Sequence, residues 1–271
     1  MHLRNPRQVI SIVLLLSSAN LLAACQRKAE QSNMSEETQR ARGAEIVAEF
    51  QKRDSAPSRH VQLRMVIATA DQPEKEYEFE IWRKQDPGET KSLLHVVKPA
   101  TERQLASLSI QQAGENPQNV TYHPANNQFE EFDADRQAFG GLTVQEMLGD
   151  WSKYEHRLIG EKELDGVKVY EIENTLKPNE SSIIKRFIVL IRADNMLPAE
   201  AHVFNAEGKE IRTYRIKEYR TIEGHPTFWR IEIENPVRRT KIALEVLNES
   251  FNERLDEDLF TRENLKRLAT A

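Results

Sequence analysis

The stretch Lys75-Glu-Tyr-Glu-Phe-Glu-Ile-Trp82 decides the fold, because apolar side chains alternate with carboxylates at every second position. Side chains on a β-strand point to opposite faces in turn, so Tyr77, Phe79 and Ile81 share one face. On a helix the two kinds would be mixed on every side. The stretch therefore predicts a strand with one apolar face and one wet face, which is typical of antiparallel sheets.

Similar segments follow along the chain, separated by turn sequences such as Asp86-Pro87-Gly88 and Asp165-Gly166. Many short strands with turn signals between them and few helices predict a mainly β, antiparallel domain. Shorter helical patterns lie at 143–148 and 262–268. We expect strands at 61–67, 76–81, 92–97, 105–111, 119–122, 128–132, 156–161, 168–174, 184–192, 199–205, 210–219, 228–234 and 240–246.

One longer helix is expected before the first strand. Ser35 is a candidate N-cap, Glu36 and Glu37 give an acidic first turn, and apolar residues recur at helical spacing up to about Arg53. This helix has a narrow apolar stripe, which predicts packing against the core. A helix that also covers a cavity is the alternative.

The amino terminus has the pattern of a secretory signal. Arg4 and Arg7 precede an apolar run from Val9 to Leu22, which is too short to cross a hydrocarbon core that needs about 20 residues. The run ends in Leu22-Ala23-Ala24-Cys25, which contains the only cysteine and resembles the lipobox of bacterial lipoproteins. This resemblance implies a signal peptide over 1–24 and lipid attachment at Cys25. An ordinary cleaved signal is the alternative.

Several acyl chains on Cys25 would anchor the protein durably, because one chain alone holds only marginally. Residues 25–34 then form the lipidated N-terminus and a polar tether, and 35–271 form the domain. Gln26 replaces the aspartate that tends to retain bacterial lipoproteins at the inner membrane. The expected location is the cell envelope, facing the periplasm, at the outer membrane rather than the inner one.

Charge and chemistry exclude several classes of function. Loss of residues 1–24 removes Arg4 and Arg7, leaving 36 basic and 43 acidic residues and a net charge of −7. Nucleic acid and anionic lipid headgroups both require a basic face, so neither is an expected partner. We find no hydrolase, metalloprotease, P-loop or dinucleotide motif, and we expect neither catalysis nor a cofactor or metal.

An acidic cluster, with Glu130, Glu131, Asp133 and Asp135, could bind calcium, but a solvated strand end is the simpler interpretation. Beside it, residues 129–151 are rich in large apolar side chains around Gly140-Gly141. A glycine pair that leads into a short helix can cover one face of a sheet. These side chains either fill the core or line an apolar ligand pocket. The candidate ligand-binding residues are Phe132, Phe139, Met147 and Trp151.

Several short motifs resemble the outer-membrane lipoprotein-sorting (LolA-like) family. They are Phe139-Gly140-Gly141, Asn195-Met196-Leu197-Pro198, Val203-Phe-Asn-Ala-Glu-Gly-Lys209, Ile222-Glu-Gly-His-Pro226 and Leu259-Phe260-Thr261. The resemblance implies a curved, incomplete antiparallel β-barrel covered by an N-terminal helix and short lid helices. It also implies an apolar cavity for lipid chains. This chain departs from the soluble sorting chaperone in its expected anchor at Cys25.

The expected function is that of a membrane-anchored lipoprotein that binds lipid or lipoprotein acyl chains. It would serve lipoprotein sorting or envelope lipid transport, with an envelope lipid transporter as a further partner. The alternative is a non-catalytic structural or adaptor lipoprotein that docks in an envelope transport complex. The carrier predicts a cavity of several hundred Å³, whereas the adaptor predicts a closed, tightly packed interior.

Overall fold

The computed structural model describes residues 34–52, 56–133, 135–148 and 151–270. The signal peptide at 1–24, the lipid-attachment candidate Cys25 and all of the tether but Met34 lie outside the described residues. Within the described ranges, no helix is long and apolar enough to cross a membrane.

The described residues form one antiparallel sheet of thirteen strands, which confirms the predicted fold class and each expected strand. The strands are β1 Ser58–Thr69, β2 Lys75–Asp86, β3 Glu89–Lys98, β4 Ala106–Gln112, β5 Gln118–His123, β6 Gln128–Phe132, β7 Tyr154–Leu164, β8 Val167–Leu176, β9 Arg186–Arg192, β10 Pro198–Phe204, β11 Glu210–Ile222, β12 His225–Asn235 and β13 Thr240–Phe251.

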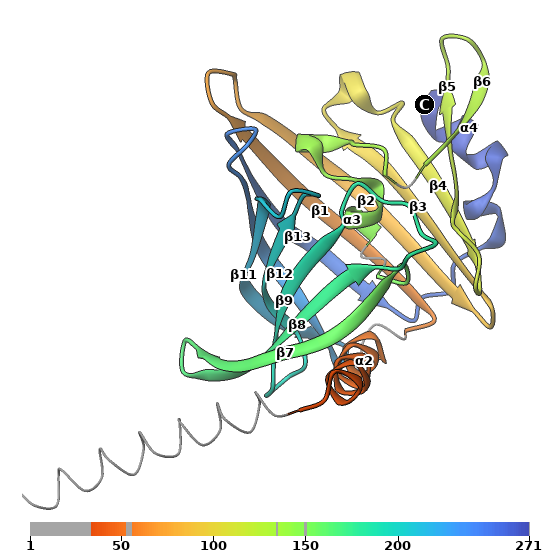
Figure 1. The fold of residues 1–271 in the computed structure, drawn as a ribbon. Helices are drawn as coiled ribbons and strands as arrows, with labels where there is room; N and C mark the ends of the chain where they lie inside the picture. The colour runs from red at the N-terminus through yellow and green to blue at the C-terminus, as the bar shows by residue number, and fades with distance from the viewer. Residues whose placement is uncertain (1–33, 53–55, 134, 149–150, 271) are drawn as a thin grey trace, which may run out of the picture.

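The sheet consists of two meanders that meet at β1 and β13. Strands β1 to β6 follow one another in one direction, β13 back to β7 follow in the other, and β1 pairs with both β2 and β13. Figure 1 shows the resulting wide, curved sheet. Strands β6 and β7 are consecutive in the chain but lie at the two opposite edges.

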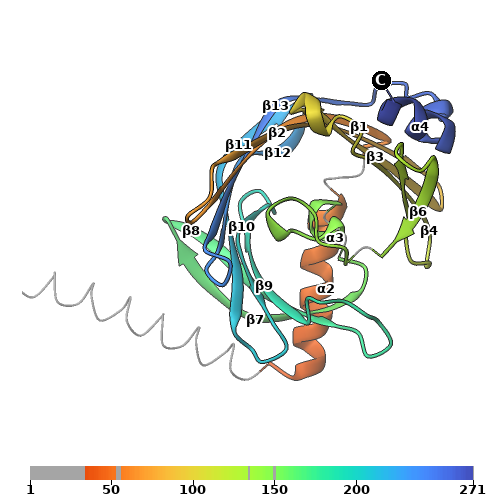
Figure 2. The same cartoon turned by 90° about the horizontal axis from the view of Figure 1, so that it is seen from above.

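The sheet curves around an interior that holds α2 Glu36–Lys52 and α3 Val144–Leu148, as Figure 2 shows from above. The alternation in β2 places its apolar side chains on one face of the sheet and its carboxylates on the other, as predicted. Tyr77 and Phe79 are buried in the main core cluster with Met65 and Val96, whereas Glu78 faces the other way and pairs with Lys98 at 2.8 Å. The concave face therefore carries the core.

The connection from β6 to β7 joins the two opposite edges of the sheet, and it runs across the concave face. Its described residues 135–148, which we call the inner segment, contain η3 Phe139–Gly141 and α3. Phe139, Leu142 and Met147 pack on the core of β1, β2, β3, β12 and β13. The predicted helix at 143–148 is confirmed with its first residue, Thr143, as the cap.

Helix α2 begins after Ser35, whose hydroxyl accepts a hydrogen bond from the backbone N–H of Thr38 at 3.2 Å, as an N-cap does. Its buried residues Ile46 and Val47 pack on the concave face of β7 to β9. The helix therefore fills the interior at the β7 end of the sheet.

Helix α4 Arg262–Thr270 covers the opposite, convex face of β3, β4 and β5. Leu265 and Phe260 pack there against Leu93 and Leu108, whereas Leu94, the neighbour of Leu93, faces the interior. Thr261 caps this helix, since its Oγ1 accepts a hydrogen bond from the backbone N–H of Asn264 at 3.2 Å. Two further short 3₁₀ turns are η2 Ala100–Glu102 and η4 Glu257–Phe260.

Candidate functional site

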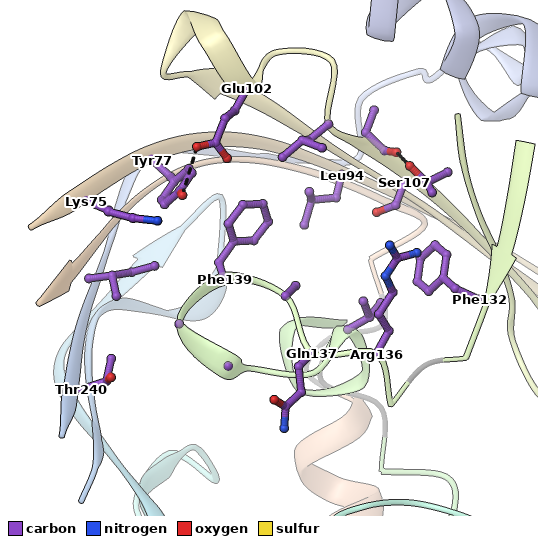
Figure 3. A pocket seen from close by; sticks show the side chains of 18 of the residues that line it. Lys75, Tyr77, Leu94, Glu102, Ser107, Phe132, Arg136, Gln137, Phe139 and Thr240 are labelled. Atoms are coloured by element: carbon purple, nitrogen blue, oxygen red, sulfur yellow. Dashed lines mark hydrogen bonds between the residues drawn. The ribbon is translucent and has the colours of Figure 1, made fainter. Parts of the chain in front are cut away.

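The concave face of β1 to β5 retains an open pocket of about 680 Å³, which we call the concave pocket. Figure 3 shows it between the sheet and the inner segment. Helix α2 and the inner segment occupy the rest of the interior, so the pocket is the part of the concave face that they leave uncovered. Its lining comes from β1 to β6, η2, the inner segment, the β12–β13 turn and the start of β13.

The deep wall of the pocket is aromatic and aliphatic. The ring of Phe139 lies with its centroid 4.8 Å from that of Tyr77 and 4.8 Å from that of Phe79. Leu94 lies beside this cluster and also lines the pocket. The hydroxyl of Tyr77 donates to Glu102 at 3.3 Å, so its polar end is satisfied while its ring stays apolar. This wall is suited to hydrocarbon.

The rim of the pocket is polar, and its charged residues are mostly cationic. Lys75, Arg136 and Arg238 all contribute to the lining. Arg136 is paired with Glu130 at 2.9 Å, and Arg238 donates a hydrogen bond to Gln137 of the inner segment. In Figure 3 the Lys75 side chain points toward the space in front of the inner segment. The pocket thus combines an apolar wall with a charged rim.

Two glycines bring the inner segment close to the sheet. Gly140 has φ +62°, a conformation that L side chains rarely adopt, and a Cβ there would stand 2.5 Å from Ile242 Cδ1. Gly141 has φ +82°, and a Cβ there would lie 3.0 Å from Arg238 Nε. The glycine pair predicted as a covering loop therefore sets the close approach of Phe139 to the core.

A buried polar network fixes the other end of the inner segment. Glu146 forms an ion pair with Arg212 of β11, and its Oε1 accepts a hydrogen bond from the hydroxyl of Tyr214 at 2.6 Å. Arg212, only 2% exposed, also donates to the carbonyl of Gly141 at 2.9 Å. Burial, reinforced by the nearby Glu146 carboxylate, raises the pKa of Tyr214 well above its ordinary value.

The network includes a capping box at the start of α3. The hydroxyl of Thr143 accepts a hydrogen bond from the backbone N–H of Glu146 at 3.1 Å, and Glu146 Oε2 accepts one from the backbone N–H of Thr143 at 2.8 Å. The Thr-x-x-Glu spacing could have been recognised in the sequence. The partners Arg212 and Tyr214 could not, because they lie 66 and 68 residues away from Glu146.

The structure brings together three of the four candidate ligand-binding residues and separates the fourth. Phe132 and Phe139 line the concave pocket, and Met147 lies next to Phe139 in a small enclosed cavity of about 40 Å³. Trp151 lies under α2, where its ring centroid is 5.0 Å from that of Phe50 and 5.4 Å from that of Phe187. It is absent from the described lining of both cavities.

The acidic residues beside the pocket make contacts within the protein. Glu130 pairs with Arg136, Glu131 pairs with Arg262 at 2.7 Å, and Asp135 accepts a hydrogen bond from the hydroxyl of Ser182 at 2.9 Å. Over the ranges that the structure describes, no group of three or more histidine, cysteine or acidic residues is placed to hold a metal ion.

A second pocket of about 660 Å³ lies outside this arrangement, at the β4–β5 end near α4. Leu108, Val120 and Phe260 contribute apolar surface there, and Lys153, Glu180 and Arg262 contribute charges. The concave pocket differs from it in having the core aromatic cluster as its wall.

Comparison with known proteins supports the fold. A family model described only as an uncharacterized protein matches residues 88–267, from the β2–β3 turn into α4. None of the curated proteins matches the chain.

Three solved structures are similar over most of the chain. They are a DUF1329 family protein from Desulfovibrio piger (TM-score 0.77, 18% identity, 84% of this chain and 99% of that one), a domain named for outer membrane lipoprotein sorting from Vibrio parahaemolyticus (0.76, 16%, 84% and 100%) and a LolA superfamily protein from Nitrosomonas europaea (0.69, 18%, 82% and 98%). At these identities the similarity is one of fold, and it confirms the LolA-like architecture predicted from the sequence.

Proposed function

Because the chain belongs to the family of uncharacterized proteins whose model matches residues 88–267, and has a LolA-like fold, we propose that it binds acyl chains. The chains would belong to a lipid or a lipoprotein, and the concave pocket would hold them. The role would be in lipoprotein sorting or lipid transport in the bacterial envelope, and not in catalysis.

The observation that carries this proposal is the pocket itself. Its volume of about 680 Å³ falls within the range of roughly 300–1,000 Å³ that is usual for small-molecule sites. Its wall combines the side chains of Leu94 and Phe139 with the ring of Tyr77, which pack in one apolar cluster. An adaptor with a closed interior has no need of such a space.

The site of action in this proposal follows from the amino terminus. Acylation of Cys25 would hold the protein on a membrane, and the polar residues 26–34 would join that anchor to α2. Similar structures include a domain named for outer membrane lipoprotein sorting, which supports a place in the periplasm. The pocket would then accept lipid from, or deliver it to, the envelope near the anchor.

The test is occupancy of the pocket in the full protein purified from bacterial membranes. Native mass spectrometry would count lipid that is bound non-covalently, and extraction would identify it. Thr121→Trp places a large ring in the concave pocket, whereas Thr175→Trp places the same ring at an exposed position on β8. We expect lipid on the wild type and on Thr175→Trp and strongly reduced lipid on folded Thr121→Trp. Equal occupancy in the two variants, or none in the wild type, would refute the proposal.

A further inference from the structure

The charge of the concave pocket is opposite to that of the whole chain. The chain has a formal net charge of −5, yet the pocket lining contains Lys75, Arg136 and Arg238 against a single carboxylate, that of Glu102. His123, which also lines the pocket, has its ring hydrogen-bonded to Glu130 outside it. A local excess of cations in an acidic protein indicates that the pocket holds an anion.

Two of these cations have no carboxylate partner among the residues that the structure describes. Arg136 has a carboxylate partner in Glu130, at 2.9 Å. Lys75 and Arg238, by contrast, have no carboxylate within 4.0 Å among the residues that the structure describes. Elsewhere on the surface cations are commonly paired, and the neighbouring Arg239 contacts Asp71 at 3.1 Å. The charges of Lys75 and Arg238 are therefore available to a ligand.

Both cations belong to the same end of the sheet. Lys75 begins β2 directly after the β1–β2 turn, and Arg238 lies in the β12–β13 turn. The two turns are joined by a backbone hydrogen bond from the N–H of Ala70 to the carbonyl of Arg239 at 3.1 Å. The cations thus stand on adjoining turns at one rim, with the aromatic wall deeper in the pocket.

Arg238 is also held in position by the inner segment. Its guanidinium donates a hydrogen bond to Gln137, and its side chain passes so close to Gly141 that a Cβ there would lie 3.0 Å from Nε. An exposed arginine that is fixed in this way loses less conformational entropy when it binds an anion. A guanidinium matches the oxygens of a phosphate group particularly well.

From this arrangement we infer that the rim binds a phosphate-containing anionic headgroup, with Lys75 and Arg238 as its ligands and the acyl chains against the Phe139 wall. The inference rests on the proposed acyl-chain binding and names its substrate class, an anionic glycerophospholipid. A zwitterionic lipid is a poorer ligand, because its ammonium group would bring a positive charge next to the two cations.

The experiment offers the detergent-solubilised full protein an equimolar mixture of phosphatidylglycerol and phosphatidylethanolamine with identical acyl chains. Native mass spectrometry then gives the ratio of the two bound lipids. A separate incubation with a diacylglycerol of the same chains measures acyl binding without a headgroup charge. The variants are Lys75→Gln/Arg238→Gln in the rim and Lys209→Gln/Arg254→Gln, which removes two exposed cations outside the concave pocket.

We expect the wild type and the Lys209→Gln/Arg254→Gln control to bind about tenfold more phosphatidylglycerol than phosphatidylethanolamine. Two charge-assisted contacts at an exposed rim contribute an effect of about this size. Lys75→Gln/Arg238→Gln should bind both phospholipids equally and retain diacylglycerol. Equal binding by the wild type, or an unchanged preference in the rim variant, would overturn the inference while leaving acyl binding intact.

Two further outcomes are decisive. If inorganic phosphate alone binds at the rim while the wild type shows no preference for phosphatidylglycerol, the site takes free anions and the assignment to a lipid headgroup is wrong. If neither diacylglycerol nor either phospholipid binds, the proposed function itself fails, and the inference fails with it.

Discussion

Gly43 of α2 lies directly on the backbone of Arg157 in β7: a Cβ on Gly43 would stand 2.8 Å from both the N and the Cα of Arg157. No ordinary side chain fits in this space, because the atoms in the way belong to the main chain. The absence of a side chain at Gly43 is therefore what allows Ile46 and Val47 to reach the concave face.

Gly43→Ala should destabilise the protein, although glycine-to-alanine exchange normally favours a helix by about 1 kcal/mol. Forcing a methyl group against the β7 backbone should outweigh that gain, at a cost of about 1–3 kcal/mol. The measurement is the free energy of unfolding in denaturant. Ala44→Gly, at the adjacent exposed position, is the control and should cost about 1 kcal/mol through helix propensity alone. A stabilised Gly43→Ala protein would show that α2 is not seated on β7.

Gly140→Ala should lower stability more than Gly88→Ala, although both glycines have positive φ. The backbone cost of about 1–2 kcal/mol is common to both. At Gly88 nothing lies within 4 Å of the added Cβ, whereas at Gly140 it meets Ile242 Cδ1 at 2.5 Å. Thermal unfolding should therefore show a larger fall in Tm for Gly140→Ala. The same two substitutions are then made in an Ile242→Val protein, which lacks that Cδ1 methyl group. There the falls in Tm for Gly140→Ala and Gly88→Ala should be more nearly equal.

Removing one partner of the buried Glu146–Arg212 pair should be severe. Glu146→Ala leaves the Arg212 guanidinium buried without its carboxylate, at an expected cost of about 3–5 kcal/mol. Replacing both at once, Glu146→Leu with Arg212→Met, should cost clearly less than the sum of the single changes, because no unpaired charge remains. Denaturant unfolding of the four proteins measures this coupling. Additive costs would mean that the two side chains do not interact.

Phe139 and Trp151 should differ in what their loss affects. Phe139→Ala removes part of the pocket wall and should reduce bound lipid in the folded protein. Trp151→Ala removes contacts with Phe50 and Phe187 and should lower Tm while leaving lipid occupancy per folded molecule unchanged. Native mass spectrometry and thermal unfolding of the same preparations separate the two effects. A loss of lipid in folded Trp151→Ala would place this residue in the ligand site after all.

The strands were predictable from sequence because their signal is local. Tyr77 and Phe79 reach one face by alternation alone, and Ser35 and Thr261 mark their helices through a hydroxyl and an N–H three residues away. The glycine pair 140–141 likewise indicated a covering loop. Its long crossing was not predictable, because it depends on the strand order, which places β6 and β7 at opposite edges, and on the packing of the inner segment against the core.

The site was only partly predictable because its contacts are long-range. Their apolar character made Phe139 and Trp151 equal candidates in the sequence. In the structure, α2 and β9 enclose Trp151, whereas Phe139 lines the pocket. In the sequence Lys75 is one polar residue of an alternating strand. Its place beside Arg238 at the rim could not be predicted, because the two residues meet only through the pairing of distant strands. Which apolar residues stay accessible depends on what covers them, and that is a property of the whole sheet.

Stability should depend on pH through Glu173 on β8. Burial alone would raise the pKa of Glu173, but hydrogen bonds from Arg157 at 3.2 Å and Arg186 at 2.8 Å outweigh burial and lower this pKa in the folded state. A lowered folded-state pKa stabilises the protein above the unfolded-state value of about 4.3, and this contribution is lost as the pH falls through the folded pKa. The Tm difference between wild type and Glu173→Gln should thus be largest near neutral pH and shrink progressively below about pH 4.3. The control is Glu115→Gln, at an exposed carboxylate for which the described residues provide no ion pair. A Tm difference for Glu173→Gln that is constant from pH 7 to pH 3 would mean that the two arginines do not hold this carboxylate in solution.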